Sequence, residues 1–122
     1  MSEQADLLKQ RTFQFALDAI ELTRAFPQTE PGRMVARQFM RSATSVGANY
    51  RAACRARSHA EFTSKIGIVA EEADECRYWL DIAAGTHLAN GERLQNLQRE
   101  ASELCAIFSK AVGTARRNAS AR

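Results

Sequence analysis

The sequence predicts an all-α fold, an up-down-up-down antiparallel four-helix bundle that assembles as a ring. Two observations predict the bundle: four stretches carry an apolar face at helical period, and short turn-forming segments separate them, with no alternating strand pattern. The 122 residues suffice for one domain with a single core and are too few for two. We therefore expect a single domain over residues 1–122, with a flexible tail at about 115–122.

The first helix, expected over residues 6–25, has more apolar surface than one core requires. One face carries Leu8, Phe15, Ala19, Leu22 and Phe26. A second face, which also includes Ala16, carries Phe13, Leu17 and Ile20. Exposed apolar patches of this size are uncommon on monomers. We therefore predict a subunit interface at Phe13, Leu17 and Ile20; the alternative is that neighbouring helices simply bury this helix more deeply.

The second helix, expected over residues 30–57, segregates charge strongly. It follows a turn bracketed by Pro27 and Pro31, with Thr29 as the expected N-cap. Residues 33–57 contain six arginines and no acidic residue. At about 100° per residue, five of the arginines fall within an arc of about 80°. We call these five the cationic stripe: Arg33, Arg37, Arg41, Arg51 and Arg55.

The third helix, expected over residues 59–85, carries most of the acidic residues that could neutralise the stripe. Ser58 and Glu61 form a capping-box pattern at its start. Its acids are Glu61, Glu71, Glu72, Asp74, Glu75 and Asp81. The fourth helix is expected over residues 91–116, with Asn90 as its cap.

Motifs for catalysis and ligand binding are poorly represented. No Glu-x-x-His pair, activated serine or phosphate-binding glycine loop occurs, and the three cysteines lie far apart. We expect no catalytic residue, metal, cofactor or small-molecule substrate, and no enzymatic activity. The absence of an apolar run of about 20 residues argues against a membrane span. The N-terminal residues lack the pattern of a secretion signal, so we expect a cytoplasmic protein.

The order of several motifs resembles a known family. The run Arg41-Ser-Ala-Thr-Ser-Val-Gly-Ala-Asn49, the tight corner at Ser58 and the pair Glu61-Phe62 resemble the four-helix-bundle family named after proteins encoded within intervening sequences of bacterial 23S rRNA genes. Common members continue the run with Ile-Ala-Glu-Gly, whereas this chain has Tyr-Arg-Ala-Ala at residues 50–53. The resemblance implies a homopentamer. It also implies similarity to the accessory variability protein of diversity-generating retroelements, a basic pentamer that works with a reverse transcriptase and nucleic acid.

Two hypotheses of function follow. In the first, an oligomer binds nucleic acid, with RNA favoured, through contacts of the cationic stripe with phosphates. In the second, the protein is a structural or protein-interaction scaffold whose arginines form ion pairs with the acidic third helix. The pairs considered are Arg55 with Glu61, and Arg51 or Arg41 with Glu72 or Glu75. Arginines that face solvent favour the first hypothesis, and arginines with carboxylate partners favour the second.

Overall fold

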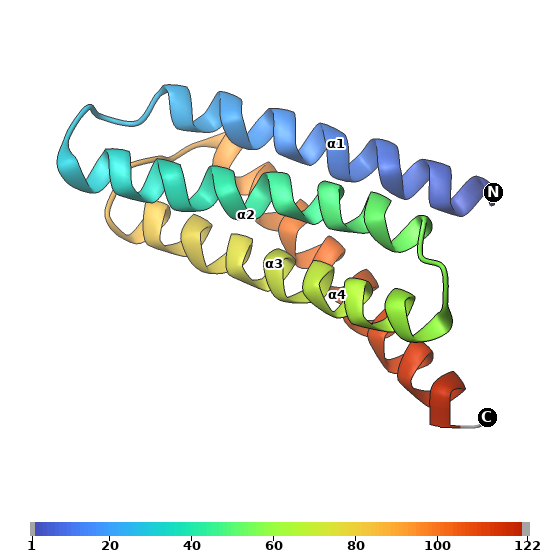
Figure 1. Ribbon diagram of the computed structural model, residues 1–122. Coiled ribbons are helices and arrows are strands. Elements are labelled where there is room, and N and C mark those ends of the chain that lie inside the picture. The colour runs from blue at the N-terminus through green and yellow to red at the C-terminus, as the bar shows by residue number, and fades with distance from the viewer. Residues whose placement is uncertain (1, 121–122) are drawn as a thin grey trace.

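The computed structural model describes residues 2–120, apart from the side chain of Ser120, and in that range every regular element is a helix. The helices are α1 (Glu3–Arg24), α2 (Glu30–Cys54), α3 (His59–Gly85) and α4 (Glu92–Ser120). Figure 1 shows them lying side by side as a bundle, with short connections and with both chain ends at the same end of the molecule. The predicted all-α bundle of four helices is confirmed.

Side-chain caps start the first three helices. Thr29 Oγ1 accepts a hydrogen bond from the backbone N–H of Gly32 at 3.2 Å, and Ser58 Oγ accepts one from the N–H of Glu61 at 3.0 Å, as predicted. Ser2 Oγ accepts from the N–H of Ala5 at 3.0 Å in the same way. Each hydroxyl satisfies one of the unpaired N–H groups of a first helical turn. The cap at Ser2 explains why α1 begins three residues before its predicted start.

The prediction that Asn90 caps the fourth helix is wrong. Gly91 precedes the first residue of α4, and its carbonyl oxygen accepts the first helical hydrogen bond, from the N–H of Gln95 at 3.1 Å. Gly91 has a φ of 87°, a left-handed conformation that costs glycine little because it has no Cβ. Asn90 therefore lies one residue too early to act as the cap.

Two helix ends also differ from their predicted positions. α2 ends at Cys54, three residues before the predicted 57, because the tight corner before Ser58 interrupts the helical hydrogen bonds. α4 continues to Ser120, beyond the predicted 116 and through most of the predicted tail. Ala115 is buried, and its carbonyl oxygen lies 2.9 Å from His59 Nε2, so α3 holds this part of α4. The last two residues of the predicted tail, 121–122, lie outside the described residues.

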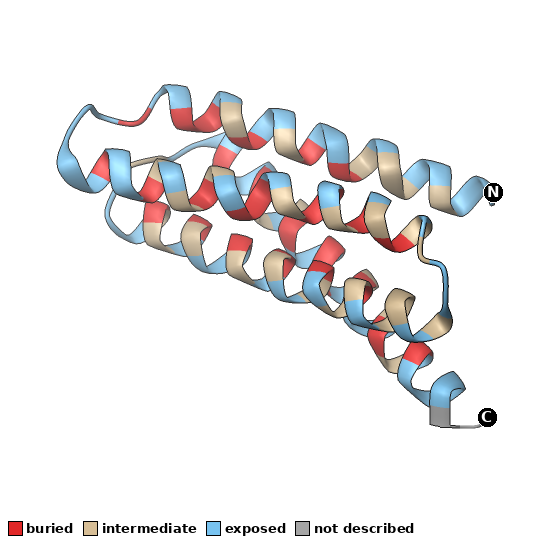
Figure 2. Cartoon of the chain, viewed as in Figure 1, coloured by how far each residue is buried: buried red, intermediate tan, exposed pale blue. Residues whose placement is uncertain are grey.

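A single apolar core connects the four helices. Phe15, Phe39 and Phe108 are among its largest buried side chains, and the rings of Phe15 and Phe39 meet edge to face at 6.4 Å. Figure 2 shows the buried residues on the inward side of each helix. α1 approaches α2 closely at Gly47, where an added Cβ would lie 3.2 Å from Thr12 Oγ1. α3 packs extensively on α2 and α4, whereas α1 and α4 make few contacts and leave an open seam between them.

Candidate nucleic-acid interface

All five arginines of the cationic stripe are exposed: four lie on one side of α2, and Arg55 is the residue that caps its C-terminal end. The four occupy this side because the opposite side of the helix carries Val35, Phe39, Val46 and other core residues. The regular helical turn then places every arginine of the sequence pattern away from the core. The predicted arrangement of the stripe is therefore present, but the surroundings of its members differ.

Arg41, in the middle of the stripe, is held by two carboxylates of α3. Its Nη1 donates to Glu72 Oε2 at 2.9 Å, and its Nη2 donates to Glu75 Oε1 at 2.5 Å. Hydrogen bonding, first to Glu75 and then to Glu72, raises the pKa of Arg41 above its ordinary value. The same contact with Arg41 lowers the pKa of Glu75, which also accepts a hydrogen bond from Trp79 Nε1. The ion pairs considered for Arg41 are therefore confirmed, and its charge is largely compensated within the chain.

The other four arginines of the stripe have no carboxylate within 4.0 Å in the described part of the chain. Arg33 Nη1 donates to the carbonyl oxygen of Gln28 at 2.8 Å. The guanidinium of Arg51 lies over the ring of Phe13, 5.9 Å from its centroid, at a distance typical of a cation–π contact. These four are Arg33, Arg37, Arg51 and Arg55.

The ion pair considered between Arg55 and Glu61 is not present. Glu61 instead accepts a hydrogen bond from the backbone N–H of Arg57 at 3.0 Å and lies 3.9 Å from the Arg57 guanidinium. Arg57 is the closer residue because α2 has already ended, which brings the corner of the chain over the start of α3. Likewise, Arg51 pairs with neither Glu72 nor Glu75, because these carboxylates lie beside Arg41, and Arg51 is ten residues, about 15 Å, farther along α2.

The predicted second face of α1 is largely uncovered. We call Phe13, Leu17 and Ile20 the outer α1 face: Phe13 is 53% exposed, Leu17 is 45% exposed and Ile20 is half-buried. Ile20 lines a depression of about 350 Å³ together with Met40, Arg33 and Arg37. The outer α1 face and the cationic stripe therefore adjoin each other on one side of the bundle.

Sequence reasoning missed an apolar surface on α3. Tyr78 is 58% exposed, and Ile68 is also exposed. Trp79 is half-buried, and its ring meets that of Tyr78 edge to face at 5.1 Å. Together with half-buried Ile82 these residues form what we call the outer α3 face. The signal was present in the sequence, because apolar residues of this helix occur on the side opposite the core as well as toward it.

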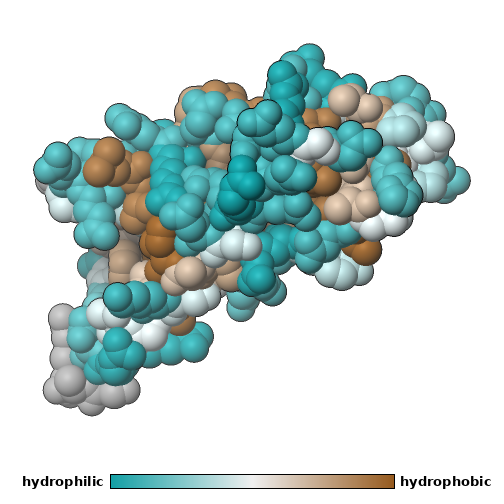
Figure 3. Space-filling view, turned by 180° about the vertical axis from the view of Figure 1, so that it is seen from behind, coloured by the Kyte–Doolittle hydropathy of each residue, from teal (hydrophilic) through white to brown (hydrophobic). Residues whose placement is uncertain are grey.

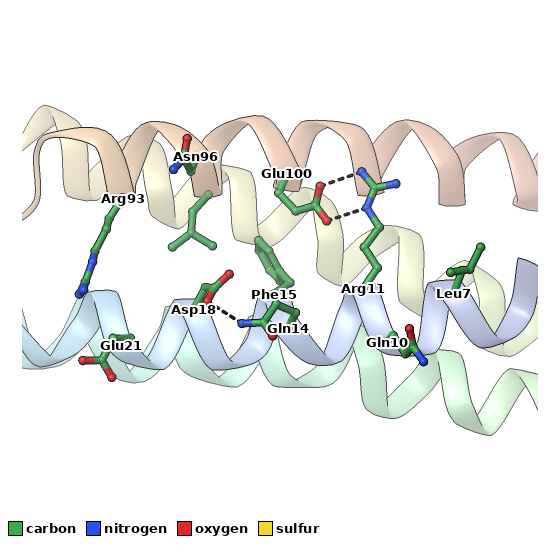
Figure 4. A pocket seen from close by; sticks show the side chains of 11 residues that line it. Leu7, Gln10, Arg11, Gln14, Phe15, Asp18, Glu21, Arg93, Asn96 and Glu100 are labelled. Carbon is green, nitrogen blue, oxygen red and sulfur yellow. Dashed lines mark hydrogen bonds and ion pairs between the residues drawn. The ribbon is translucent and has the colours of Figure 1, made fainter.

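The open seam between α1 and α4 forms a pocket of about 930 Å³. Arg11 crosses this seam: its Nε and Nη2 donate to the two carboxylate oxygens of Glu100, each at 2.7 Å (Figure 4). Its Nη2 also lies 3.1 Å from Glu103. The hydrogen bonds with Glu100 are the main cause of a raised pKa for Arg11. No histidine, cysteine or serine lines the pocket. Its main polar contact is therefore an ion pair that joins two helices.

The face behind the view of Figure 1 has a further apolar region. Figure 3 shows hydrophobic atoms gathered in a band toward the end of the bundle where the C-terminus lies. At this end a cavity of about 560 Å³ lies between α1 and α4, over Tyr50 and Phe108. Of the three cysteines, Cys76 and Cys105 are buried and Cys54 is half-buried, and burial raises the pKa of Cys76 to about 12.

The described residues 2–120 contain no group of three or more His, Cys, Asp or Glu side chains arranged to bind a metal ion. No helix among them is both long enough and apolar enough to cross a membrane.

Comparisons with known proteins agree with the family resemblance of the motifs. The chain is similar to the crystal structure of a protein with unknown function from the S23 ribosomal protein family of Bacteroides thetaiotaomicron VPI-5482. The two are 28% identical, with a TM-score of 0.78, over 85% of this chain and 96% of that chain. No curated protein matches the chain. The model of the 23S rRNA-intervening sequence protein family matches residues 6–110. The chain therefore belongs to the 23S rRNA-intervening sequence protein family.

Proposed function

We propose that the protein is a non-enzymatic, self-assembling nucleic-acid-binding protein, with RNA as the favoured ligand. The observation that carries this proposal is the group of four exposed arginines, along α2 and at its C-terminal end, that have no carboxylate partner in residues 2–120. Guanidinium groups bind phosphates well because they are permanently charged and donate paired hydrogen bonds. The phosphate contacts are assigned to Arg33, Arg37, Arg51 and Arg55, and Arg41 is left out because Glu72 and Glu75 hold it.

Binding of this kind is weakly sequence-specific. Contacts to phosphates fix position but do not read the bases. Stacking on unpaired bases requires exposed aromatic rings beside the cations. Among residues 2–120 the cation–π contact of the stripe is that of Arg51 with Phe13, so Arg51 already covers one face of this ring.

The test is the dependence of affinity on salt. Four phosphate contacts predict a log–log slope of about −2.8 to −3.6 for binding to RNA or DNA. Replacing Arg37 and Arg51 with alanine removes two contacts and should flatten the slope by roughly 1.4 to 1.8. The matched control is Arg41→Ala, which should leave the slope unchanged because its guanidinium is already paired. Fluorescence anisotropy with a labelled oligonucleotide measures the slope, and circular dichroism checks the fold. Salt-independent binding, or no binding at low salt, would contradict the proposal.

We propose in addition that copies assemble as a ring through the outer α1 face. A closed ring needs two different surfaces on each subunit, one to meet the other on the next copy. The outer α1 face and the outer α3 face are two such apolar surfaces on separate helices. The short connections support the expected up-down-up-down order of helices within each subunit. The number five follows from the family resemblance alone.

Charge placed in the outer α1 face should dissociate the assembly. Leu17→Glu with Ile20→Glu would bury two unpaired carboxylates in an apolar contact, at a cost of several kcal/mol. A matched control adds the same two charges at exposed polar positions of the same helix, Gln4→Glu with Gln10→Glu. Sedimentation velocity at micromolar concentration should show an oligomer for the wild type and the control, and a monomer for the first variant. A wild type that sediments as a 13.6 kDa monomer would contradict the assembly.

A scaffold function is the second candidate, and the ion pairs of Arg41 with Glu72 and Glu75 favour it. In that case the remaining arginines would meet acidic groups of another protein or another copy. The salt experiment separates the two candidates, because a scaffold gives an oligomer with no affinity for nucleic acid.

A further inference from the structure

Removing Arg41 from the set of available cations divides the stripe into two separate pairs. Arg33 and Arg37 lie near the start of α2, and Arg51 and Arg55 lie at its end. At 1.5 Å per residue, the midpoints of the two pairs are about 27 Å apart along the helix, and the nearest members are about 21 Å apart. The exposed residues between them include Thr44 and Ala48, which carry no charge.

The two pairs are fixed relative to each other. α2 is continuous from Glu30 to Cys54, and buried residues occur along its whole length, from Gly32 to Ala53. Core packing on α1 and α3 therefore holds the helix in place over the distance between the pairs. A ligand that contacts both pairs must present phosphates at a matching separation. A rigid ligand does so without the entropy that a flexible strand loses when it is ordered.

From this arrangement we propose that the ligand is double-stranded RNA, lying along α2 and contacting both arginine pairs at once. The proposal rests on the nucleic-acid function proposed above and specifies its substrate class. A duplex holds its phosphates in a fixed repeat, whereas single-strand binding would need aromatic stacking platforms that the stripe lacks. The separation of about 27 Å is shorter than the axial repeat of roughly 34 Å in B-form DNA. It suits the more compact A-form duplex, whose backbone shape proteins recognise.

The length of the duplex provides the test. A base pair occupies about 3 Å of the duplex axis, so a duplex of about 6 base pairs is too short to contact both pairs, and one of about 12 base pairs spans them. Blunt RNA duplexes of about 6 to 16 base pairs should show a step in affinity within this range. The step should be tenfold or more, because the second pair binds within the same complex. Single-stranded RNAs of the same lengths should bind more weakly, and their affinity should show no step with length. DNA duplexes should show a smaller step in affinity than RNA duplexes.

Two variants locate the step on α2. Arg33→Ala with Arg37→Ala removes one pair, and Arg51→Ala with Arg55→Ala removes the other. Each should abolish the step while short duplexes still bind. Arg41→Ala is the control and should retain the step. Equal binding of single strands, equal binding of DNA duplexes, or a step that survives in both variants would overturn the inference and leave the proposed function standing. No binding of any probe at low salt would overturn both.

Discussion

Arg37 and Arg41 are one helical turn apart on α2, yet their electrostatic surroundings are opposite. No carboxylate of the described chain lies within 4.0 Å of Arg37, whereas Arg41 contacts both Glu72 and Glu75. The residue type, the helix and the exposed side are the same for both. The difference comes from α3, which presents two glutamates one turn apart where Arg41 reaches them. A run of like charges in a sequence therefore defines a surface only after the neighbouring helix is placed.

The same arrangement occurs at a second helix contact. Arg11 on α1 meets Glu100 and Glu103 on α4, again two glutamates separated by three residues. Residues three apart on a helix lie on the same face, so both carboxylates can approach one guanidinium. Arg11 and Arg41 thus connect neighbouring helices. This pattern distinguishes arginines that hold the bundle together from arginines that are available to a ligand.

The largest expected effect comes from releasing Arg41. Glu72→Gln with Glu75→Gln removes both carboxylates, so Arg41 becomes a fifth available cation between the two pairs. We expect tighter binding to RNA and a salt slope steeper by about 0.7 to 0.9. The control variant Glu71→Gln with Asp81→Asn removes the same two charges from exposed positions of α3 and leaves Arg41 paired. Anisotropy titrations over a range of salt concentrations measure both quantities.

Comparison of the two variants separates a local effect from a general one. Suppose that the control gains as much RNA affinity, and as steep a salt dependence, as the variant Glu72→Gln with Glu75→Gln. In that outcome the gain comes from the lower negative charge of the whole protein. The distinction between Arg41 and the other arginines would then have no functional meaning. A gain confined to the Glu72 and Glu75 variant would strengthen the comparison.

Local signals in the sequence predicted much of the fold. The apolar period predicted the four helices, and the hydroxyl caps at Thr29 and Ser58 predicted two of their starts, because a cap depends on residues within one turn. The start of α4 was harder to predict, because Gly91 acts there through its φ angle and not through a side chain. The extension of α4 to Ser120 depends on burial of Ala115 against distant residues.

The candidate site, like the fold, could be predicted from the sequence only in part. Helical geometry predicted that the arginines share one side of α2, and the spare apolar residues predicted the exposure of Phe13 and Leu17. The partner of Arg41 depends on the rotation of α3 about its axis, which the sequence pattern left open. The contact of Arg51 with Phe13 joins two helices in the same way. The sequence could therefore place the stripe but could not identify its neutralised member.

A smaller effect is expected on stability. Arg41→Ala should lower the free energy of unfolding by about 1 kcal/mol, because half of the Arg41 side chain is exposed and exposed ion pairs contribute little. The loss lies at the upper end of that range because Glu72, which is only 13% exposed, is left without its cation. Arg37→Ala should change the free energy of unfolding by no more than about 0.5 kcal/mol, as is usual for substitutions of exposed side chains. Urea unfolding of both variants at pH 7 measures the difference.

Acid should remove this difference between the variants. Arg41 lowers the pKa of Glu75 below its ordinary value of 4.5, so the carboxylate stabilises the folded state above the unfolded pKa. That contribution is lost as the pH falls through the lower pKa of the folded state. The wild type should therefore exceed Arg41→Ala in stability at pH 7 and 5, and the gap should shrink below about pH 4. For Arg37→Ala the gap should not change with pH. A gap for Arg41→Ala that persists undiminished at pH 2 would mean that Arg41 stabilises the bundle by packing its side chain and not by pairing with the carboxylates of α3.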